Sequence, residues 1–299
     1  MICSPLVLSA PAKLNLSLAV TGKRRDGYHL LQSVMQSIAL YDQVELQATP
    51  GPEPVQVALS CSIPELPTGQ ENVAVQAALA FCRQARPGFA KIQIHLKKGI
   101  PFQAGLGGAS ADGAAVLRGL NRLSKTPLSS EELGRLAASI GADLPFCLQG
   151  GCCLAQGIGE QLTLLPPVHG GWFVLIKPPF GCSTPEVFSR YDQLPPPPSY
   201  DLAPQLDALT KGDLTALGPT LFNGLTQAAG RKELLEGIKF LLTRGALGSC
   251  MTGSGSTVFG LFGHSSNFFY HYFCISISSV FLFYGYVRYI KFIHFTFSK

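Results

Sequence analysis

Residues 101–117 read Pro-Phe-Gln-Ala-Gly-Leu-Gly-Gly-Ala-Ser-Ala-Asp-Gly-Ala-Ala-Val-Leu, a glycine-rich run that passes directly into sequence typical of a helix. The loop glycines lack a Cβ, so the backbone there can adopt positive φ and approach a bound group closely. The first N–H groups of a helix have no acceptor within the helix and attract anions such as phosphate. We expect Ser110 as a cap or early-turn hydroxyl and Asp112 as an acid in the first turn, where the helix dipole favours it.

Two standard glycine motifs do not fit this stretch. A P-loop requires Lys and then Ser or Thr after its last glycine, and Ala109 follows Gly108 here. A dinucleotide fingerprint that begins at Gly105 would place its third glycine at position 110, where this chain has Ser. A plain structural turn stays open as an alternative, because many glycine-rich segments are only turns.

The length predicts two lobes, and the charge is compatible with a mild attraction for phosphorylated small molecules. The 299 residues are enough for two medium-sized domains, and the formal net charge of +5 is modest. Lys and Arg are scattered along the chain, which gives no nucleic-acid footprint. Nine cysteines occur without a Cys-x-x-Cys pair or zinc spacing, so we expect buried thiols in a reducing compartment. No signal or transit peptide is visible, and the expected location is the cytoplasm.

The pattern of apolar residues predicts a chain of mixed strands and helices. Alternation from Lys13 to Leu18 predicts a strand with Lys13 and Asn15 on one face, and a helix is expected from Asn72. The Ser-Ser-Glu-Glu run at 129–132 is a helix N-terminal signal. Further segments are a strand near Asp42–Ala48, strands at 55–59, 91–96, 152–155, 160–164, 172–176 and 258–262, helices at 110–123 and 133–140 and from 184, a turn at 141–146, a proline spacer at 195–198 and helices to 244.

The last part of the sequence differs from the rest. Positions 264–299 hold eight Phe and five Tyr among 36 residues, with no Ala, Pro, Asp or Glu. The run 267–287 is about long enough to cross a bilayer, which leaves a membrane anchor open. Its many hydroxyl groups make it less apolar than a typical span, so we favour a tail whose reading frame or gene model departs from the original end.

Five separate pieces of sequence together resemble one known family. They are Ala-Pro-Ala-Lys-Leu-Asn-Leu at 10–16, Asp-Gly-Tyr-His at 26–29, the glycine loop, Gly-Ala-Asp-Leu-Pro-Phe at 141–146 and Thr-Gly-Ser-Gly-Ser-Thr-Val-Phe at 252–259. In this order and spacing they are similar to the GHMP kinases over residues 8–262. The Asp-Gly-Tyr-His piece resembles the member that acts on a cytidine diphosphate sugar-alcohol, and a homoserine or mevalonate type of kinase stays open.

The resemblance implies an α+β fold of two lobes. The N-terminal lobe, residues 1–155, is expected to be similar to ribosomal S5 domain 2 and to contain the glycine loop. The C-terminal lobe, residues 156–263, is expected as an α/β sandwich that is incomplete, because the aromatic-rich tail 264–299 does not resemble the family's closing helix and strand. A sheet that lacks its closing strand would expose an edge.

The resemblance also implies phosphoryl transfer from ATP, with Mg²⁺, to a hydroxyl group. Asp143 is expected as the general base or as the group that orients the acceptor hydroxyl, and Lys13 as the cation that keeps Asp143 ionised. The cytidine site is expected to contain an aromatic stack and polar contacts to the base. The implied residues are Pro101, Gly105, Leu106, Gly107, Gly108, Ala109, Ser110, Ala111, Asn72 and Lys98 for ATP, Ser110 for Mg²⁺, and Asn15, Tyr28, His29, Thr184 and Phe188 for the substrate.

Two substitutions in the glycine loop depart from the family pattern. Ala109 stands where members commonly have Gly, and Ala111 stands where they have a second Ser, which leaves Ser110 as the loop hydroxyl. A non-catalytic, frame-shifted copy is therefore a further alternative. A homodimer is left open, and no membrane or nucleic-acid partner is expected.

Overall fold

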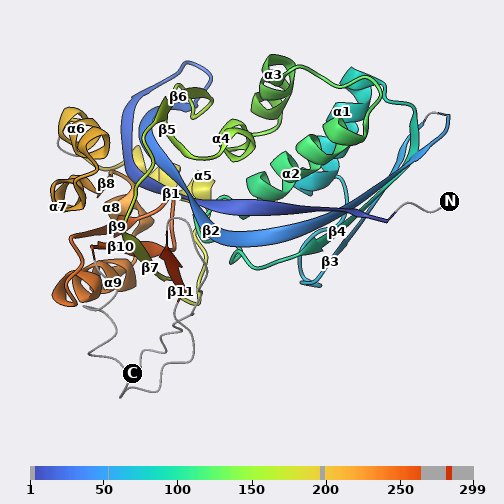
Figure 1. Ribbon diagram of the computed structural model, residues 1–299. Helices are drawn as coiled ribbons and strands as arrows, with labels where there is room; N and C mark the ends of the chain where they lie inside the picture. Colours follow the sequence, from blue (N-terminus) through green and yellow to red (C-terminus); the bar gives the residue numbers. More distant parts are fainter. Residues whose placement is uncertain (1–3, 53, 196–198, 264–280, 285–299) are drawn as a thin grey trace. The chain divides into compact units, whose positions relative to one another are not determined.

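The computed structural model describes residues 4–52, 54–195 and 199–263, together with the backbone of 281–284 (Figure 1). The chain forms two compact units that interleave along the sequence. The first contains residues up to 12, 40–100 and 107–150, and the second contains 13–39, 101–106 and the chain from 151 onward. The units are thus discontinuous, whereas the sequence predicted contiguous lobes that meet at residue 155; those lobe bounds stay a prediction.

The first unit is built on an antiparallel and parallel sheet with strand order β3-β4-β2-β1. These strands are β1 (Leu6–Lys23), β2 (His29–Pro50), β3 (Gln56–Cys61) and β4 (Phe89–Lys97), of which β1 and β2 continue into the second unit. β2 runs antiparallel to β4 with Gln43 opposite Lys97, and β3 runs parallel to β4. Buried and exposed residues alternate along β4, as expected for a sheet with one covered face.

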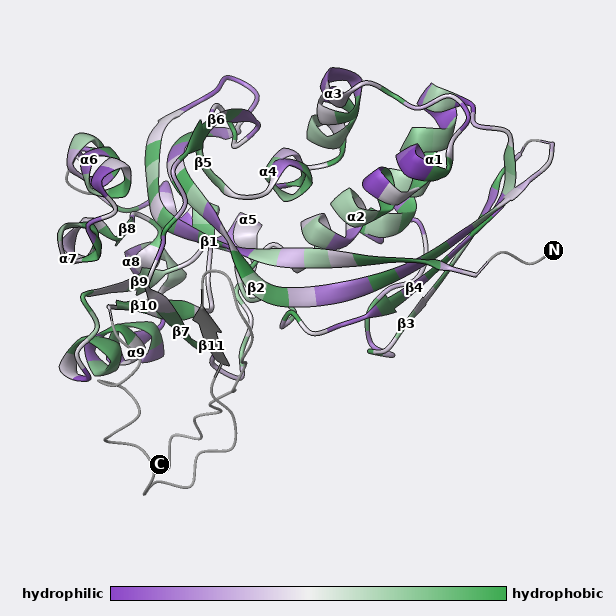
Figure 2. Cartoon of the chain, in the orientation of Figure 1, coloured by the Kyte–Doolittle hydropathy of each residue, from purple (hydrophilic) through white to green (hydrophobic). Residues whose placement is uncertain are grey.

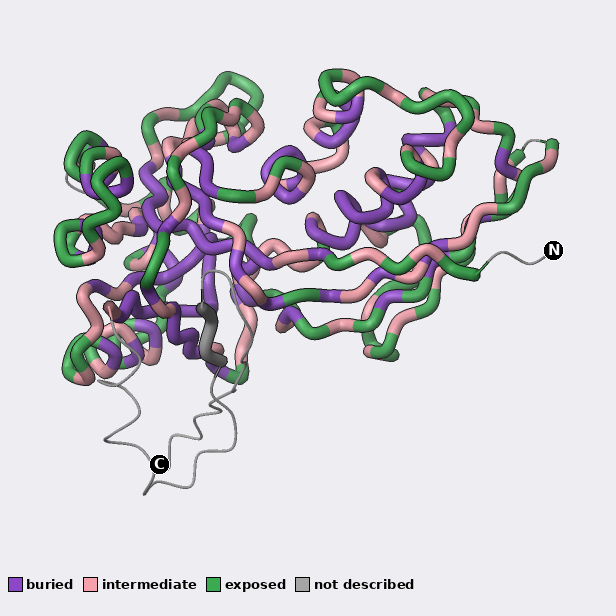
Figure 3. Tube along the Cα trace, in the orientation of Figure 1, coloured by how far each residue is buried: buried purple, intermediate pink, exposed green. Residues whose placement is uncertain are grey.

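Four helices belong to the first unit: α1 (Val73–Ala85), α2 (Gly108–Leu123), α3 (Ser130–Ile140) and α4 (Leu144–Gln149). Asn72 caps α1, and Ser129 and Glu132 form a reciprocal capping box on α3, so both predicted helix starts are confirmed. Figure 1 shows α1 and α2 along one face of the sheet. Figure 3 shows α2 buried over most of its length, which holds its N-terminus in a fixed place.

In the second unit, β1 pairs with β8 (Phe222–Asn223), and β2 pairs with β5 (Cys152–Gln156), which continues to β6 (Gln161–Leu165). A separate sheet has the order β11-β7-β10-β9. Its strands are β7 (Trp172–Ile176), β9 (Gly248–Met251), β10 (Val258–Phe262) and β11 (Phe281–Tyr284). The helices are α5 (Thr184–Tyr191), α6 (Ala203–Lys211), α7 (Leu214–Leu217), η1 (Gly218–Thr220), α8 (Thr226–Ala229) and α9 (Lys232–Thr243).

An apolar core joins these elements. Val174 of β7, Val258 and Phe262 of β10, and Leu234 and Leu241 of α9 are all buried in one cluster. In Figure 2 the strands β7 and β10 are hydrophobic along their length, as a sheet with both faces covered requires. This core supports the turn between β9 and β10, which carries part of the candidate site.

The structure differs from the predictions at several places, one of which is the short strand β8 in a region where only helices were predicted. The helix after the glycine loop begins at Gly108, two residues earlier than predicted, so Asp112 is its fifth residue and not an acid of its first turn. The turn predicted at 141–146 contains the start of α4, and β9 was not predicted. The sequence predicted that the C-terminal sheet lacks a closing strand, whereas β11 pairs antiparallel with β7, Phe281 opposite Leu175.

The predictions for the aromatic-rich tail and for the proline spacer concern residues that the structure describes only in part. Residues 264–280 and 285–299 of the tail and residues 196–198 of the proline spacer lie outside the described residues. Within the described part of the chain, no helix combines the length and apolar character needed to span a bilayer.

Candidate active site

The glycine loop enters α2 through a left-handed residue. Gly107 is the N-cap residue of α2 with φ 72°, a conformation that glycine adopts without a steric penalty. Ala109 is exposed and Ser110 half-buried at the second and third helical positions, so Ser110 is an early-turn residue as predicted. Ala111 is fully buried, and its methyl group therefore belongs to the core of the unit. The departure from the family pattern at 111 thus falls on a core-facing position.

A buried ion cluster lies beside this helix start. Lys98 Nζ contacts Asp42 Oδ2 and lies 2.5 Å from Asp112 Oδ2. Asp42 Oδ1 accepts hydrogen bonds from the backbone N–H groups of Gly99, at 2.6 Å, and Ile100, at 2.8 Å. Lys98 was predicted to border the nucleotide; in the structure its side chain is 6% exposed and its ammonium group contacts two carboxylates.

Burial and the neighbouring charges together shift the pKa values of Asp112 and Lys98. Burial raises the pKa of Asp112 to about 7, against the attraction of Lys98 and with the repulsion of Asp42. Burial lowers the pKa of Lys98, but the two carboxylates outweigh it, and the net pKa lies above the ordinary value for lysine. One ammonium group between two carboxylates leaves an excess negative charge, which a proton on Asp112 neutralises.

We expect Asp112 to make the folded state less stable as pH rises. The folded protein retains the proton of Asp112 up to about pH 7, whereas the unfolded chain releases it near pH 4, so the free energy of unfolding falls across that interval. Asp112→Asn cannot titrate, and its stability relative to the wild type should therefore increase between pH 4 and 7. Urea unfolding of both proteins at pH 5 and pH 8 measures this, and a constant difference would contradict it.

Two further predicted residues of the first unit are helix N-caps. The Asn72 Oδ1 atom accepts from the Ala74 N–H at 2.9 Å and its Nδ2 donates to the Pro67 carbonyl at 2.7 Å, so its amide shapes the start of α1. Asp143 precedes α4 at its N-cap position and is half-buried. Pro145 at the start of this helix fixes the backbone directly after Asp143.

In the second unit, Lys13 and Asn15 meet on β1 as the strand period predicts. Lys13 Nζ donates to Asn15 Oδ1 at 2.6 Å, and both residues are almost fully buried. Asn15 Oδ1 also accepts from the Gly253 N–H at 3.0 Å, and its Nδ2 donates to Ser33 Oγ at 2.8 Å. The Asn15 N–H donates to Thr252 Oγ1 at 3.0 Å. Asn15 therefore holds Lys13 against the turn between β9 and β10.

The first half of the glycine loop belongs to the same group. The Leu106 carbonyl accepts from the Lys13 N–H at 3.0 Å, and the Gly105 carbonyl accepts from Thr252 Oγ1 at 3.3 Å. The Ala104 carbonyl accepts from the Thr257 N–H at 3.2 Å. Lys13, the loop residues 104–106 and the 252–257 turn thus form one hydrogen-bonded network.

An aromatic group lies at the start of β2 and on α5. The His29 ring stacks on Phe188 with centroids 4.6 Å apart, and Tyr28 beside it is 61% exposed. His29 Nε2 lies 2.7 Å from Asp192 Oδ1. Hydrogen bonds from Lys23 and His29 hold the pKa of Asp192 below its ordinary range, so this carboxylate is an acceptor and His29 Nε2 is the donor. In a neutral ring, Nδ1 is then left as an acceptor.

Comparison with known proteins identifies the family to which the chain belongs. The family model described as "GHMP kinases N terminal domain" matches residues 72–151, and the one described as "GHMP kinases C terminal" matches residues 205–274. A 4-diphosphocytidyl-2-C-methyl-D-erythritol kinase of Desulfitobacterium hafniense strain Y51 is 43% identical over 266 residues, which cover 87% of this chain and 88% of that protein. The chain belongs to the GHMP kinase family.

Solved structures agree with this membership. A crystal structure of 4-(cytidine 5'-diphospho)-2C-methyl-D-erythritol kinase matches with a TM-score of 0.70 and 33% identity, over 88% of this chain and 92% of that one. A homoserine kinase from Cytophaga hutchinsonii matches with a TM-score of 0.68 and 20% identity, over 89% and 88% of the two chains. The second likeness is one of fold, and both confirm the predicted two-domain GHMP kinase architecture of mixed helices and sheets.

In this GHMP kinase chain some predicted site residues contact one another, and others contact groups that were not predicted. Lys13 and Asn15 form one pair and His29 and Phe188 another; Thr184, one turn before Phe188 on α5, shares a hydrogen bond of 2.7 Å with Ser254 Oγ. Asn72 and Lys98 are engaged by groups that were not predicted as site residues. The residues that sequence reasoning missed are Asp42, Asp192, Thr252 and Ser254; the last two lie in a motif that was recognised but given no role.

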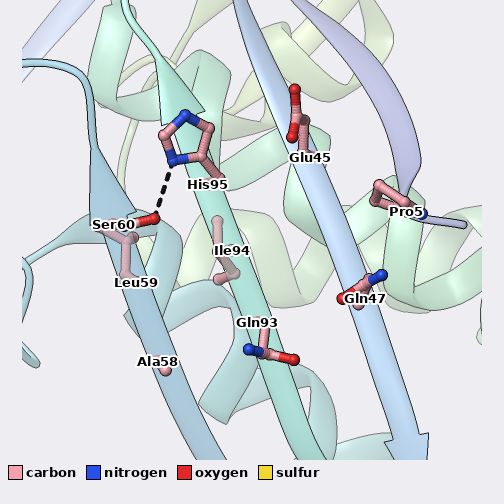
Figure 4. Close-up of a pocket in the computed structure, with 9 residues that line it drawn as sticks. All are labelled: Pro5, Glu45, Gln47, Ala58, Leu59, Ser60, Gln93, Ile94 and His95. Carbon is pink, nitrogen blue, oxygen red and sulfur yellow. Dashed lines mark hydrogen bonds between the residues drawn. The ribbon is translucent and has the colours of Figure 1, made fainter. Parts of the chain in front are cut away.

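A surface groove lies elsewhere in the first unit. It has a volume of about 370 Å³ and lies over β2, β3 and β4. Figure 4 shows its polar side chains in front of the strands, with the helices behind them, and a hydrogen bond of 2.8 Å between Ser60 Oγ and His95 Nδ1. None of the nine lining residues that the structure describes is a predicted site residue.

Proposed function

We propose that this chain transfers the terminal phosphoryl group of ATP to the 2-hydroxyl of 4-diphosphocytidyl-2-C-methyl-D-erythritol, a step of non-mevalonate isoprenoid precursor biosynthesis. The observation that carries the proposal is the 43% identity, over 87% of the chain, to a kinase of that name. GHMP kinases depend on ATP, which supplies the phosphoryl group. The Asp-Gly-Tyr-His sequence at 26–29 supports the choice of a cytidyl acceptor over homoserine or mevalonate.

The start of α2 fits the phosphates of a nucleotide. Gly107 and Gly108 place no side chain at the helix N-terminus, and a Cβ added to Gly108 would lie 3.1 Å from Ile100 Cγ2. The N–H groups of the first turn, which have no acceptor within a helix, would then be available to phosphate oxygens, together with the hydroxyl of Ser110. This arrangement supports nucleotide binding by residues 105–111 and leaves Mg²⁺ on Ser110 as a proposal from the sequence.

Asp143 takes the proton of the acceptor hydroxyl in our proposal, and Lys13 offsets the negative charge that develops. Asp143 directly precedes α4, where Pro145 restricts the backbone, and a carboxylate on a restricted backbone suits a general base. Lys13 Nζ donates to the side-chain oxygen of Asn15, which helps to hold its ammonium group in place. Positioning and electrostatic stabilisation supply most of the catalysis in phosphoryl transfer.

The stack of His29 on Phe188 supports recognition of a flat base. Cytosine presents an amino group as a hydrogen-bond donor, whereas uracil presents a carbonyl oxygen at that position. The acceptor Nδ1 of His29, set by Asp192, suits the amino group. We therefore infer that Asp192 contributes to the choice of cytidyl over uridyl substrates.

Removal of the Phe188 ring should weaken binding of the acceptor. Stacking on an aromatic side chain contributes about 1–3 kcal/mol per base, so Phe188→Ala should raise the KM for the cytidyl substrate by roughly 5- to 150-fold and leave the KM for ATP unchanged. Phe222, which stacks on Tyr200 with centroids 4.7 Å apart, offers the matched control. Steady-state kinetics with each substrate varied in turn measures both values; equal effects of Phe188→Ala and Phe222→Ala would argue against a role in base binding.

A coupled ADP-release assay with three acceptors tests the function itself. We expect turnover with the cytidyl compound and little with homoserine or mevalonate. Preference for either of the other acceptors would favour another GHMP kinase, and failure with all three would favour a non-catalytic copy. The homodimer and the cytoplasmic location are parts of the proposal that rest on the sequence alone.

A further inference from the structure

The buried ion cluster of the first unit joins the two ends of the glycine loop. Lys98, Gly99 and Ile100 directly precede Pro101, and Gly108, the first residue of α2, directly follows the loop. Lys98 precedes the loop in the sequence, and its Nζ contacts Asp112 of α2, which follows the loop. Asp42 lies at the same place, because it accepts the N–H groups of Gly99 and Ile100 and its Oδ2 would lie 3.6 Å from a Cβ on Gly108.

We propose that Asp42, Lys98 and Asp112 form a loop clamp that positions the two ends of the glycine loop and thereby sets the affinity for the nucleotide. Lys98 acts in this clamp as a positioning residue, through Asp112 and Asp42, and not as a contact to the adenine. The inference rests on the proposed function, because it assumes that the loop binds ATP. Fixing the loop before binding reduces the ordering that the nucleotide must impose.

The contacts of Asp112 make the proposal testable. Asp112 Oδ2 receives Lys98, whereas its Oδ1 is buried and has no hydrogen-bond partner among the described residues. Asp112 is thus linked to the start of the loop through Lys98, and Asp112 itself is only 3% exposed. If Lys98 acts through the clamp, loss of Asp112 must reproduce the loss of Lys98.

Lys98→Met, Asp112→Ala and the double variant should be compared by titration with a fluorescent ADP analogue and by steady-state kinetics. We expect each single variant to raise the nucleotide Kd and the KM for ATP about tenfold, with the KM of the acceptor within about twofold of the wild type. The double variant should have a nucleotide Kd no higher than that of the single variant that binds more weakly, because each single change already removes the same Lys98–Asp112 contact. Asp112→Asn, which keeps the size of the side chain, serves if Lys98→Met does not fold, and should raise Kd several-fold.

Arg118→Met is the matched control for a general loss of stability. Arg118 is also a partly buried cation and is itself a residue of α2, but it donates to the carbonyls of Cys147, at 2.8 Å, and Ser9, at 3.2 Å, and not to the residues at the loop ends. It should lower the midpoint of urea unfolding without changing the nucleotide Kd.

Each outcome decides between explanations. If Asp112→Ala and Asp112→Asn bind the analogue as tightly as the wild type while Lys98→Met binds weakly, Lys98 contacts the nucleotide directly and the clamp is wrong. An equal increase of Kd in Arg118→Met would reduce the effect to stability and overturn the clamp as well. Wild-type protein that does not bind the analogue at all would instead refute the proposed function, and the clamp with it.

Discussion

Asp143→Asn is expected to lower kcat for the cytidyl substrate by about 10²- to 10⁴-fold, the contribution usual for a general base. Asparagine keeps the shape of the side chain but cannot accept the proton of the acceptor hydroxyl. The Asp143 side chain makes no cap hydrogen bond to α4, so the substitution should leave the start of α4 at the same place. The expected defect is therefore in the chemical step, with the Kd for nucleotide nearly unchanged, and single-turnover kinetics with a nucleotide titration measures the two separately.

The chain contains a matched control for this substitution. Asp213 is the N-cap residue of α7, where its carboxylate accepts from the N–H groups of Thr215 and Ala216. Asp213→Asn makes the same chemical change at the start of a helix and should leave kcat as it is. A kcat for Asp143→Asn within about threefold of the wild type would remove Asp143 from the mechanism, since the loss of a general base costs at least about 10²-fold.

The parts of the fold that could be predicted from the sequence are those that local patterns determine. The capping box at Ser129 and Glu132, the cap at Asn72 and the alternation that puts Lys13 beside Asn15 each involve residues within four positions of one another. The glycine loop was located correctly for the same reason. The first helical residue was missed by two positions, because Gly108 and Ala109 read as loop until Gly107 is seen to act as the cap.

The contacts that determine the chemistry of the site join distant segments and carry little local signal. Asp42 lies 56 positions before Lys98, and its carboxylate on a strand reads as an ordinary polar residue. Asp192 follows His29 by 163 positions and stands at the end of a helix, where an acid has no evident purpose. The sequence predicted that Asp112 interacts favourably with the helix dipole, which is a local explanation. In the structure its partner is Lys98, which directly follows β4. Local reasoning finds the residues of a site more readily than the partners that set their charge.

Gly105→Ala is expected to lower both stability and activity, because the backbone of another segment occupies the space where the alanine Cβ would lie. A Cβ on Gly105 would be 2.2 Å from the Thr252 carbonyl oxygen and 3.0 Å from that of Gly255, and φ at Gly105 is +73°. Gly105→Ala therefore adds a steric clash to the cost of the left-handed conformation, together roughly 2–5 kcal/mol of unfolding free energy. Thr252 and Gly253 also bond Asn15, which holds Lys13, so kcat/KM should fall with stability.

Gly88→Ala separates the clash from the backbone strain. Gly88 has nearly the same φ, +70°, but no atom lies within 4 Å of an added Cβ. This variant should therefore lose only the roughly 1–2 kcal/mol of the left-handed conformation and retain the kcat/KM of the wild type. Urea unfolding and initial rates of the two variants test the comparison. If both lose the same stability and keep their activity, the loop does not pack against the 252–255 turn as the structure describes, and the network that links the nucleotide loop to Lys13 would have to be abandoned.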